Sequence, residues 1–271
     1  MAADAPPSAH RPGIFAWFGY RMPLPELFRL VRAAGFRSVS LWWDPAPTRC
    51  ATVHGMPALA RDAGLYVESA HVPFSRSNAL WAADPAVRQP VLEEYLAWLG
   101  DCAVHRIPRL VMHVVSGHGP EAPTETGMDS FRQLVRAAEA RGVTLALENT
   151  RRPDLLSALL AAFPSPRLGL CYDISHDRLW PAEAPGLLWR HGDRLATVHL
   201  SDTDGRLDRH WLPGDGVVDW PAFAAALPRG YAGPLMLEVM PYKTPALSAE
   251  AFLAEASQRA GRLDALIREH T

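Results

Sequence analysis

Short apolar segments rich in β-branched residues alternate with longer amphipathic segments along nearly the whole chain. This alternation is typical of repeated strand and helix units around a parallel sheet. Eight pairs can be counted, because each apolar segment is followed by helix-like sequence. The predicted strands are residues 14–18, 38–43, 65–69, 109–114, 143–148, 168–172, 196–200 and 235–239.

The amphipathic segments begin and end at residues that favour helix termini. Segments 25–34, 58–63 and 131–141 each stop at a glycine, which suits the left-handed position after a helix end. Asp219 and Ser248 precede two later segments and are predicted to cap the helices there.

The number of units and the chain length together predict one α/β domain, a single (β/α)8 TIM barrel. Such barrels use about 250 residues as one domain, and this chain has 271. We assign residues 13–271 to the barrel and residues 1–12 to a disordered N-terminal tail. The tail lacks the positive segment and apolar core of a secretory signal.

Composition narrows the expected partners. The chain is 48% hydrophobic but has no apolar run long enough to cross a bilayer, so no membrane contact is expected. Its three cysteines are widely spaced and include no Cys-x-x-Cys pair, which favours a reducing cytoplasm over a disulfide framework. A net charge of −2 lacks the basic footprint of most nucleic-acid binders, although arginines can cluster locally. The expected partner is a small molecule, and a homo-oligomer stays open.

Metal-ligating side chains recur at the ends of the predicted strands, where a barrel assembles its active site. Oxygen and imidazole donors of this kind bind zinc, manganese, cobalt or magnesium. They come from six strands and from the loop after the seventh: His71, His113, Glu148, Asp173, His176, His199, Asp208, His210 and Glu238. In an extended segment, the two-residue spacing of Asp208 and His210 would put both on one side.

Each of these residues also has a purely structural interpretation. A lone strand-end histidine is more often a hydrogen-bonded loop residue than a ligand, and Asp-Arg-His in a polar loop can be a solvated turn. Asp173 could cap the next segment, and His199 could be a satisfied core histidine. Glu148 and Glu238 end apolar strands, where a carboxylate is costly to bury unless it is paired, hydrogen-bonded or metal-bound. These two glutamates are therefore the strongest functional candidates.

Aromatic residues also gather near the strand ends. Trp17 and Phe18 follow the first strand, Trp42 and Trp43 lie at the second, and Phe74 follows His71. Aromatic faces suit sugar rings or planar substrates, and packing over the barrel mouth is an equal alternative. Trp17, Trp42, Phe74, His71 and His176 are predicted to contact substrate.

Seven short motifs resemble the xylose-isomerase-like TIM-barrel superfamily, which contains sugar and sugar-phosphate isomerases and epimerases and also endonuclease IV. The resemblance covers nearly the whole chain. The motifs that carry it are residues 69–74 (SAHVPF), 110–113 (LVMH), 147–149 (LEN), 170–176 (LCYDISH), 198–202 (VHLSD), 214–216 (GDG) and 237–238 (LE).

The isomerase and epimerase branch implies one divalent ion held by residues matching Glu148, Asp173, His199 and Glu238. The two glutamates then act as acid and base on a carbon next to a carbonyl group, while the metal stabilises the oxygen charge. Many isomerase-like sequences also place a substrate-binding arginine in the loop after the seventh strand, a position that Arg209 matches.

Endonuclease IV implies a different centre, with three zinc ions held by nine ligands. All nine donors given above match that pattern, and Asp-Arg-His followed by Gly-Asp-Gly is its most specific part. The resemblance therefore implies one to three divalent ions per chain.

Residues 78–88 look like the third-strand loop of the sugar enzymes. Together with the weakly acidic charge, they favour a metal-dependent isomerase or epimerase acting on a small sugar or related polyhydroxy carbonyl compound. An endonuclease IV-like multi-zinc phosphodiesterase acting on abasic DNA is one alternative, and a lyase or dehydratase on the same metal centre is another, since fold does not fix reaction. Loss of the acidic pair would have favoured a non-enzymatic barrel, but both glutamates are present.

Overall fold

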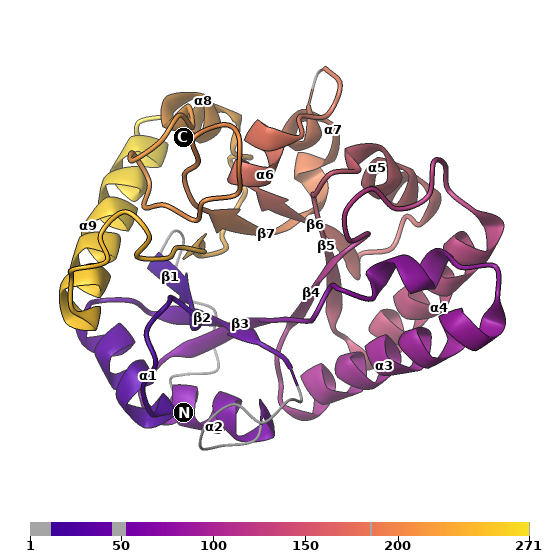
Figure 1. Cartoon of the computed structure of the whole chain (residues 1–271), viewed down its shortest axis with the longest axis horizontal. Coiled ribbons are helices and arrows are strands. Elements are labelled where there is room, and N and C mark those ends of the chain that lie inside the picture. Colours follow the sequence, from indigo (N-terminus) through magenta and orange to yellow (C-terminus); the bar gives the residue numbers. More distant parts are fainter. Residues whose placement is uncertain (1–11, 45–52, 185, 271) are drawn as a thin grey trace.

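The computed structural model describes residues 12–44, 53–184 and 186–270. Its parallel strands close into a barrel in the order β1 to β8, which confirms the predicted (β/α)8 fold (Figure 1). The strands are β1 (Pro12–Phe15), β2 (Ser38–Trp42), β3 (Tyr66–His71), β4 (Arg109–His113), β5 (Thr144–Glu148), β6 (Leu168–Asp173), β7 (Leu195–Leu200) and β8 (Leu235–Leu237). Apart from Pro12, which begins β1, the predicted disordered tail lies outside the described residues.

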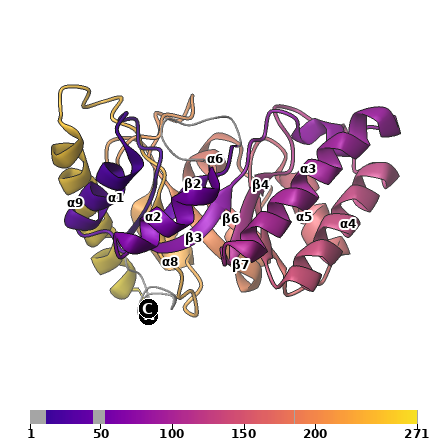
Figure 2. The same ribbon diagram turned by 90° about the horizontal axis from the view of Figure 1, so that it is seen from below.

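Helices form an outer ring around the strands, as Figures 1 and 2 show from two directions. They are α1 (Leu24–Ala33), α2 (Met56–Asp62), α3 (Pro85–Val104), α4 (Glu125–Arg141), α5 (Pro153–Ala162), α6 (Ile174–Leu179), α7 (Leu187–His191), α8 (Trp220–Ala226) and α9 (Ala249–Arg268). Short 3₁₀ helices span Val53–Gly55, Ser77–Trp81 and Gly192–Arg194. No helix in the described ranges is both long and apolar enough to span a membrane.

The predicted glycine positions after the helices and the two predicted caps are confirmed, although α4 begins at Glu125 rather than at residue 131. Gly142 follows α4 with a φ of 68°, which lies in the left-handed region that residues with a Cβ atom rarely adopt. The Asp219 side chain accepts a hydrogen bond from the backbone N–H of Ala222 at 2.9 Å and thereby caps α8. Ser248 caps α9 in the same way through Ala251, at 3.2 Å.

The first strand differs from its prediction, since it spans Pro12–Phe15 rather than residues 14–18. A proline is compatible with the first position of a strand, where no ladder hydrogen bond is lost. Pro12 pairs with Leu235 and Gly13 with Met236, so β1 closes the barrel against β8 at its very start. The prediction was wrong because it assigned Pro12 to the disordered tail and began the strand at residue 14.

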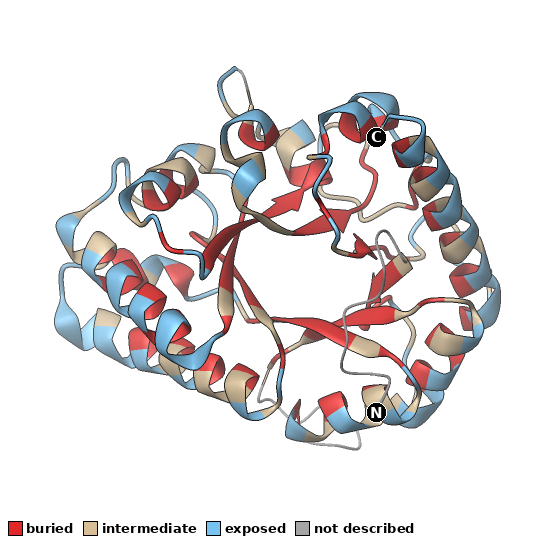
Figure 3. Ribbon diagram, turned by 180° about the vertical axis from the view of Figure 1, so that it is seen from behind, coloured by how far each residue is buried: buried red, intermediate tan, exposed pale blue. Residues whose placement is uncertain are grey.

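Burial is concentrated in the strands, which are almost entirely buried in Figure 3. The register brings neighbouring strand ends side by side: His113 pairs with Glu148 across β4 and β5, and Asp173 pairs with His199 across β6 and β7. The six strand ends that carry the predicted metal ligands therefore meet at one mouth of the barrel.

A charged pair that includes none of the predicted metal ligands lies inside the barrel, toward the amino ends of the strands. Glu68 of β3 is fully buried, and its Oε1 lies 3.2 Å from Nη1 of Arg109, the first residue of β4. Our sequence analysis did not single out Glu68. Its signal was an acid inside the otherwise uncharged stretch 65–70.

Candidate metal centre at the barrel mouth

Glu148 lies at the centre of the candidate site. Its Oε2 is 2.9 Å from Nε2 of His71 and 3.3 Å from Nε2 of His113. Its Oε1 is 3.3 Å from Nδ1 of His176 and 3.4 Å from Nδ1 of His199. Burial alone would raise the pKa of Glu148, but the surrounding imidazoles, His199 and His113 foremost, hold that pKa well below its usual value. Glu148 is therefore an ionised carboxylate.

Four residues bring one potential ligand atom each to a common point: Glu148, Asp173, His199 and Glu238, hereafter the four-ligand cluster. Their ligand atoms all lie within 4.8 Å of one another. The first three side chains are buried, and Glu238 is only 14% exposed. His71, Glu148 and His199 form a second group with equally close ligand atoms.

Several atoms of the four-ligand cluster are buried without a hydrogen-bond partner among the described residues. They are Asp173 Oδ2, Glu238 Oε2 and both ring nitrogens of His199. His199 Nδ1 lies 2.9 Å from Glu238 Oε2, yet the geometry is not that of a hydrogen bond. Buried polar atoms are nearly always satisfied, so these converging lone pairs need a cation or a ligand between them. The donor set fits a divalent metal ion.

One oxygen of Asp173 caps α6, and the other has no hydrogen-bond partner among the described residues. Its Oδ1 accepts hydrogen bonds from the backbone N–H of His176 at 2.8 Å and from the Ser175 hydroxyl at 3.0 Å, so it caps α6. Its Oδ2 faces the cluster. Burial, opposed by His176 and reinforced by the other carboxylates, raises the pKa of Asp173 to about 6. The excess of negative charge at this point favours a bound cation.

Asp208 links the remaining donors to one another. Its Oδ2 lies 3.1 Å from Nε2 of His176 and 3.1 Å from Nε2 of His210, and its Oδ1 accepts a hydrogen bond from the Ser175 hydroxyl at 3.2 Å. His210 has a φ of 47°, so the segment is not extended as our spacing argument assumed. Asp208 and His210 nevertheless meet.

Three histidines share a bonding pattern that is frequent among metal ligands. The Nδ1 atoms of His71, His176 and His210 lie 2.9–3.0 Å from the backbone carbonyls of Val72, Asn149 and Glu238. Because a carbonyl only accepts, Nδ1 carries the proton and donates it. Each Nε2 then faces a carboxylate, where a neutral ring needs a cation in between. Without a metal, protonation of His210 can take the place of the cation. Burial lowers the pKa of His210, but Asp208 outweighs burial and raises that pKa to about 9.

The loop that carries Asp208 and His210 is held by Asp202, a residue to which our sequence analysis assigned no role. Asp202 is fully buried. Its Oδ1 accepts hydrogen bonds from the backbone N–H groups of Thr203 at 2.9 Å and Val218 at 3.1 Å. Its Oδ2 accepts from the N–H of Gly214 at 2.9 Å and from Nε1 of Trp220 at 3.1 Å. One carboxylate thereby fixes both ends of the loop.

Of the predicted aromatic residues, three line the mouth beside the histidines. The Trp42 ring lies on His71 with centroids 5.4 Å apart, and Phe74 stacks on His113 at 4.1 Å. Trp17 contacts Trp42 at 5.9 Å. Phe18 instead stacks on Phe252 of α9, and Trp43 is buried with its Nε1 donating to Asp101. These last two are packing residues.

Arg209, predicted to contact substrate, is engaged within its own loop. Its guanidinium pairs with Asp204 Oδ2 at 2.8 Å and lies over the Trp211 ring at 5.8 Å.

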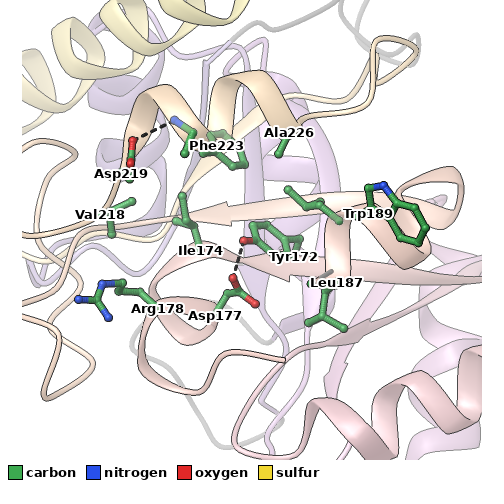
Figure 4. A pocket seen from close by; sticks show the side chains of 13 residues that line it. Tyr172, Ile174, Asp177, Arg178, Leu187, Trp189, Val218, Asp219, Phe223 and Ala226 are labelled. Atoms are coloured by element: carbon green, nitrogen blue, oxygen red, sulfur yellow. Dashed lines mark hydrogen bonds between the residues drawn. The ribbon is translucent and has the colours of Figure 1, made fainter. Parts of the chain in front are cut away.

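A separate cavity of about 400 Å³ lies outside the barrel between α6, α7 and α8 (Figure 4). Its lining includes Tyr172, whose hydroxyl donates to Asp177 Oδ2 at 3.0 Å, and the exposed Trp189. None of the nine predicted metal ligands lines this cavity. The barrel mouth is therefore the candidate site.

Comparison with known proteins agrees with the fold. Residues 28–260 match the family model described as xylose isomerase-like TIM barrel. An uncharacterized protein, y4fM of Sinorhizobium fredii, is 28% identical over 279 residues, covering 88% of each chain. The L-ribulose-5-phosphate 3-epimerase UlaE of Salmonella paratyphi C is 26% identical over 234 residues, covering 79% of this chain and 81% of that protein.

Solved structures give the same result. A structure of L-ribulose 3-epimerase superposes with a TM-score of 0.77 at 22% identity and covers 96% of each chain. The TTHB071 protein of Thermus thermophilus, in a crystal soaked with ZnCl2, has a TM-score of 0.68 at 27% identity and covers 96% of this chain and 98% of that one.

Proposed function

The chain belongs to the xylose isomerase-like TIM barrel family, and we propose that it is a divalent-metal-dependent epimerase or isomerase. Its substrate would be a small sugar or related polyhydroxy carbonyl compound. The observation that carries this proposal is the four-ligand cluster, in which several converging oxygen and nitrogen atoms are buried without hydrogen-bond partners among the described residues. The relationship to a ribulose-phosphate 3-epimerase over most of the chain supports the reaction class.

In this proposal Glu148, Asp173, His199 and Glu238 hold the ion. When bound, the ion supplies positive charge that stabilises a carbonyl oxygen as it becomes negative during proton removal. The donor types favour zinc, manganese, cobalt or magnesium and do not separate them.

Glu148 and Glu238 then move the proton. His199, despite the burial of Glu238, lowers the pKa of that carboxyl to about 2, so both glutamates are ionised and able to accept a proton at neutral pH. One carboxylate removes the proton from the carbon next to the carbonyl group and afterwards releases it to solvent. The other takes up a proton from solvent and returns it from the opposite face, which inverts that carbon. His71 and His113 contact Glu148 Oε2 and orient its carboxylate.

The test is solvent exchange. The purified protein, supplied in turn with each of the four metals, is incubated with ketoses in D2O, and deuterium next to the carbonyl is followed by NMR. Glu148→Gln keeps the shape of the side chain and removes its charge. We expect exchange to fall by about 10²–10⁴-fold without loss of folding. Full turnover by the Glu148→Gln protein would refute the assignment.

A second function is favoured by one observation, the five further donors grouped around the cluster. His71 and His113 face one oxygen of Glu148, and Asp208 lies between His176 and His210, so additional ions have ligands available. This arrangement supports an endonuclease IV-like phosphodiesterase. The weakly acidic chain argues against duplex binding. With zinc present, we expect no incision of a duplex that carries an abasic site, and efficient incision at catalytic enzyme concentrations would replace the epimerase proposal.

A further inference from the structure

An apolar cavity of about 370 Å³ lies next to the candidate metal centre, where β1 and β2 end against α1 and α2. Its lining includes Trp17, Tyr20, Met22, Leu27 and Met56. The cavity therefore offers aromatic and flexible aliphatic surface, which is suited to an apolar ligand group.

Trp42 connects this cavity to the candidate metal centre. It lines the cavity and also lies on the His71 ring, with centroids 5.4 Å apart and an interplanar angle of 28°. His71 in turn lies 2.9 Å from Glu148 Oε2. Trp17, which is 52% exposed, extends the same aromatic surface outward. A molecule reacting at Glu148 can therefore extend along Trp42 into the cavity.

The described residues of the cavity lining favour an uncharged occupant. Neither arginine nor lysine is among the described residues that line the cavity, and the single charged one, Asp44, is acidic. A phosphate or carboxylate group requires cationic or N–H donors.

We propose that the substrate carries an uncharged apolar substituent that occupies this cavity while its polyhydroxy carbonyl part reacts at the four-ligand cluster. An apolar cavity of about 150 Å³ accommodates benzene, so 370 Å³ has room for a phenyl ring and a short linker. This inference rests on the proposed function for the position of the reacting carbons and adds the class of substrate, a neutral alkyl- or aryl-substituted ketose rather than a sugar phosphate.

The test compares three kinds of probe in the deuterium-exchange assay: free ketohexoses, their terminal phosphate esters, and the same ketoses with a benzyl ether at either end of the chain. Burying a phenyl-sized group favours the benzyl ethers by about 10- to 100-fold in kcat/KM over the parent ketoses. The phosphate esters should react no faster than the parents.

Two variants address the cavity directly. Trp17→Ala removes part of its wall and should reduce the preference for the benzyl ether by about 3- to 10-fold. Met22→Trp fills the space and should bring that preference close to one. The matched control is Trp189→Ala, which removes an exposed tryptophan from the outer cavity of Figure 4 and should leave the preference unchanged.

The outcomes separate this inference from the proposed function. If parent ketoses exchange but benzyl ethers react no faster, the inference is wrong and the epimerase proposal stands. If no ketose exchanges, the epimerase proposal fails, and the cavity is tested by titrating the benzyl ethers against tryptophan fluorescence. Saturable binding that Trp17→Ala weakens would then support an apolar ligand, and absence of binding would overturn it.

Discussion

Asp202→Ala is expected to release the loop that brings Asp208 and His210 to the barrel mouth. The Asp202 carboxylate accepts hydrogen bonds from Thr203 and Val218 on one oxygen and from Gly214 and Trp220 on the other. Alanine removes all of them and leaves their donors without an acceptor. The effect on stability depends on which donors water can reach.

Gly214 is exposed and Val218 half-buried, so water can solvate their N–H groups once the loop loosens. Thr203 and Trp220 are buried, at 0% and 9% exposure, and their donors stay unsatisfied. Each buried unsatisfied donor costs about 1–3 kcal/mol. We therefore expect Asp202→Ala to lower the free energy of unfolding by about 3–4 kcal/mol and to weaken any ion held by Asp208 and His210.

Urea unfolding followed by tryptophan fluorescence measures the first effect, and elemental analysis of the dialysed protein measures the second. Asp204→Ala is the matched control, because Asp204 lies in the same loop but is partly exposed and accepts only from Arg206 and Leu207 within its own turn and from the Arg209 side chain. Its effect on stability should be small. Equal unfolding midpoints and equal metal content in the two variants would refute the role of Asp202.

Three further predictions concern the metal centre and the barrel interior. The double change Asp208→Ala with His210→Ala should lower metal content after exhaustive dialysis while the four-ligand cluster keeps its ion; unchanged content would mean that this pair contacts substrate or only shapes the loop. Saturation of the metal-free protein with a divalent ion at about 100 times its Kd should stabilise it by about 2.7 kcal/mol and raise Tm by about 5–10 °C, and no shift with any of the four metals would contradict a metal centre. Glu68→Ala should destabilise the protein by about 3 kcal/mol because Arg109 loses its buried partner; in urea unfolding, Glu68→Ala combined with Arg109→Met should recover part of this loss.

The barrel and the order of its strand-end residues could be predicted because parallel strands place all their carboxyl ends at one face. Glu148 and His113, 35 positions apart, become register partners for this reason alone. The alternation of apolar segments fixes where each strand ends to within a few residues, and the closure of the barrel brings the ends together. No knowledge of side-chain conformation was needed.

Residues whose roles depend on loop conformation or on register inside the barrel were missed. Asp202 looks like one more polar residue after a strand, and only the folded loop shows that its oxygens face four donors. Glu68 becomes meaningful only when the pairing of β3 with β4 places Arg109 beside it. For Arg209, the sequence could not show that Asp204 holds its guanidinium. Such contacts depend on the backbone conformation of loops and on strand register, and the hydrophobic pattern of the sequence predicts neither.

The number of ions follows from a balance of charge at the mouth. Glu148, Asp173, Asp208 and Glu238 carry four negative charges when ionised, and the Nε2 atoms of three histidines face carboxylates while their Nδ1 protons go to backbone carbonyls. One divalent ion in the four-ligand cluster offsets half of the negative charge. The remainder requires either protonated histidines next to Asp208 and Glu148 or a second ion at those positions. The pKa of His210, raised to about 9 mainly by Asp208 against the opposing effect of burial, favours the protonated form while no second ion is present. The same side chains thus suit either of two centres: a one-metal epimerase in which a protonated histidine lies next to Asp208, or a centre with more than one metal ion. The metal content measured for the Asp208 and His210 double variant distinguishes the two.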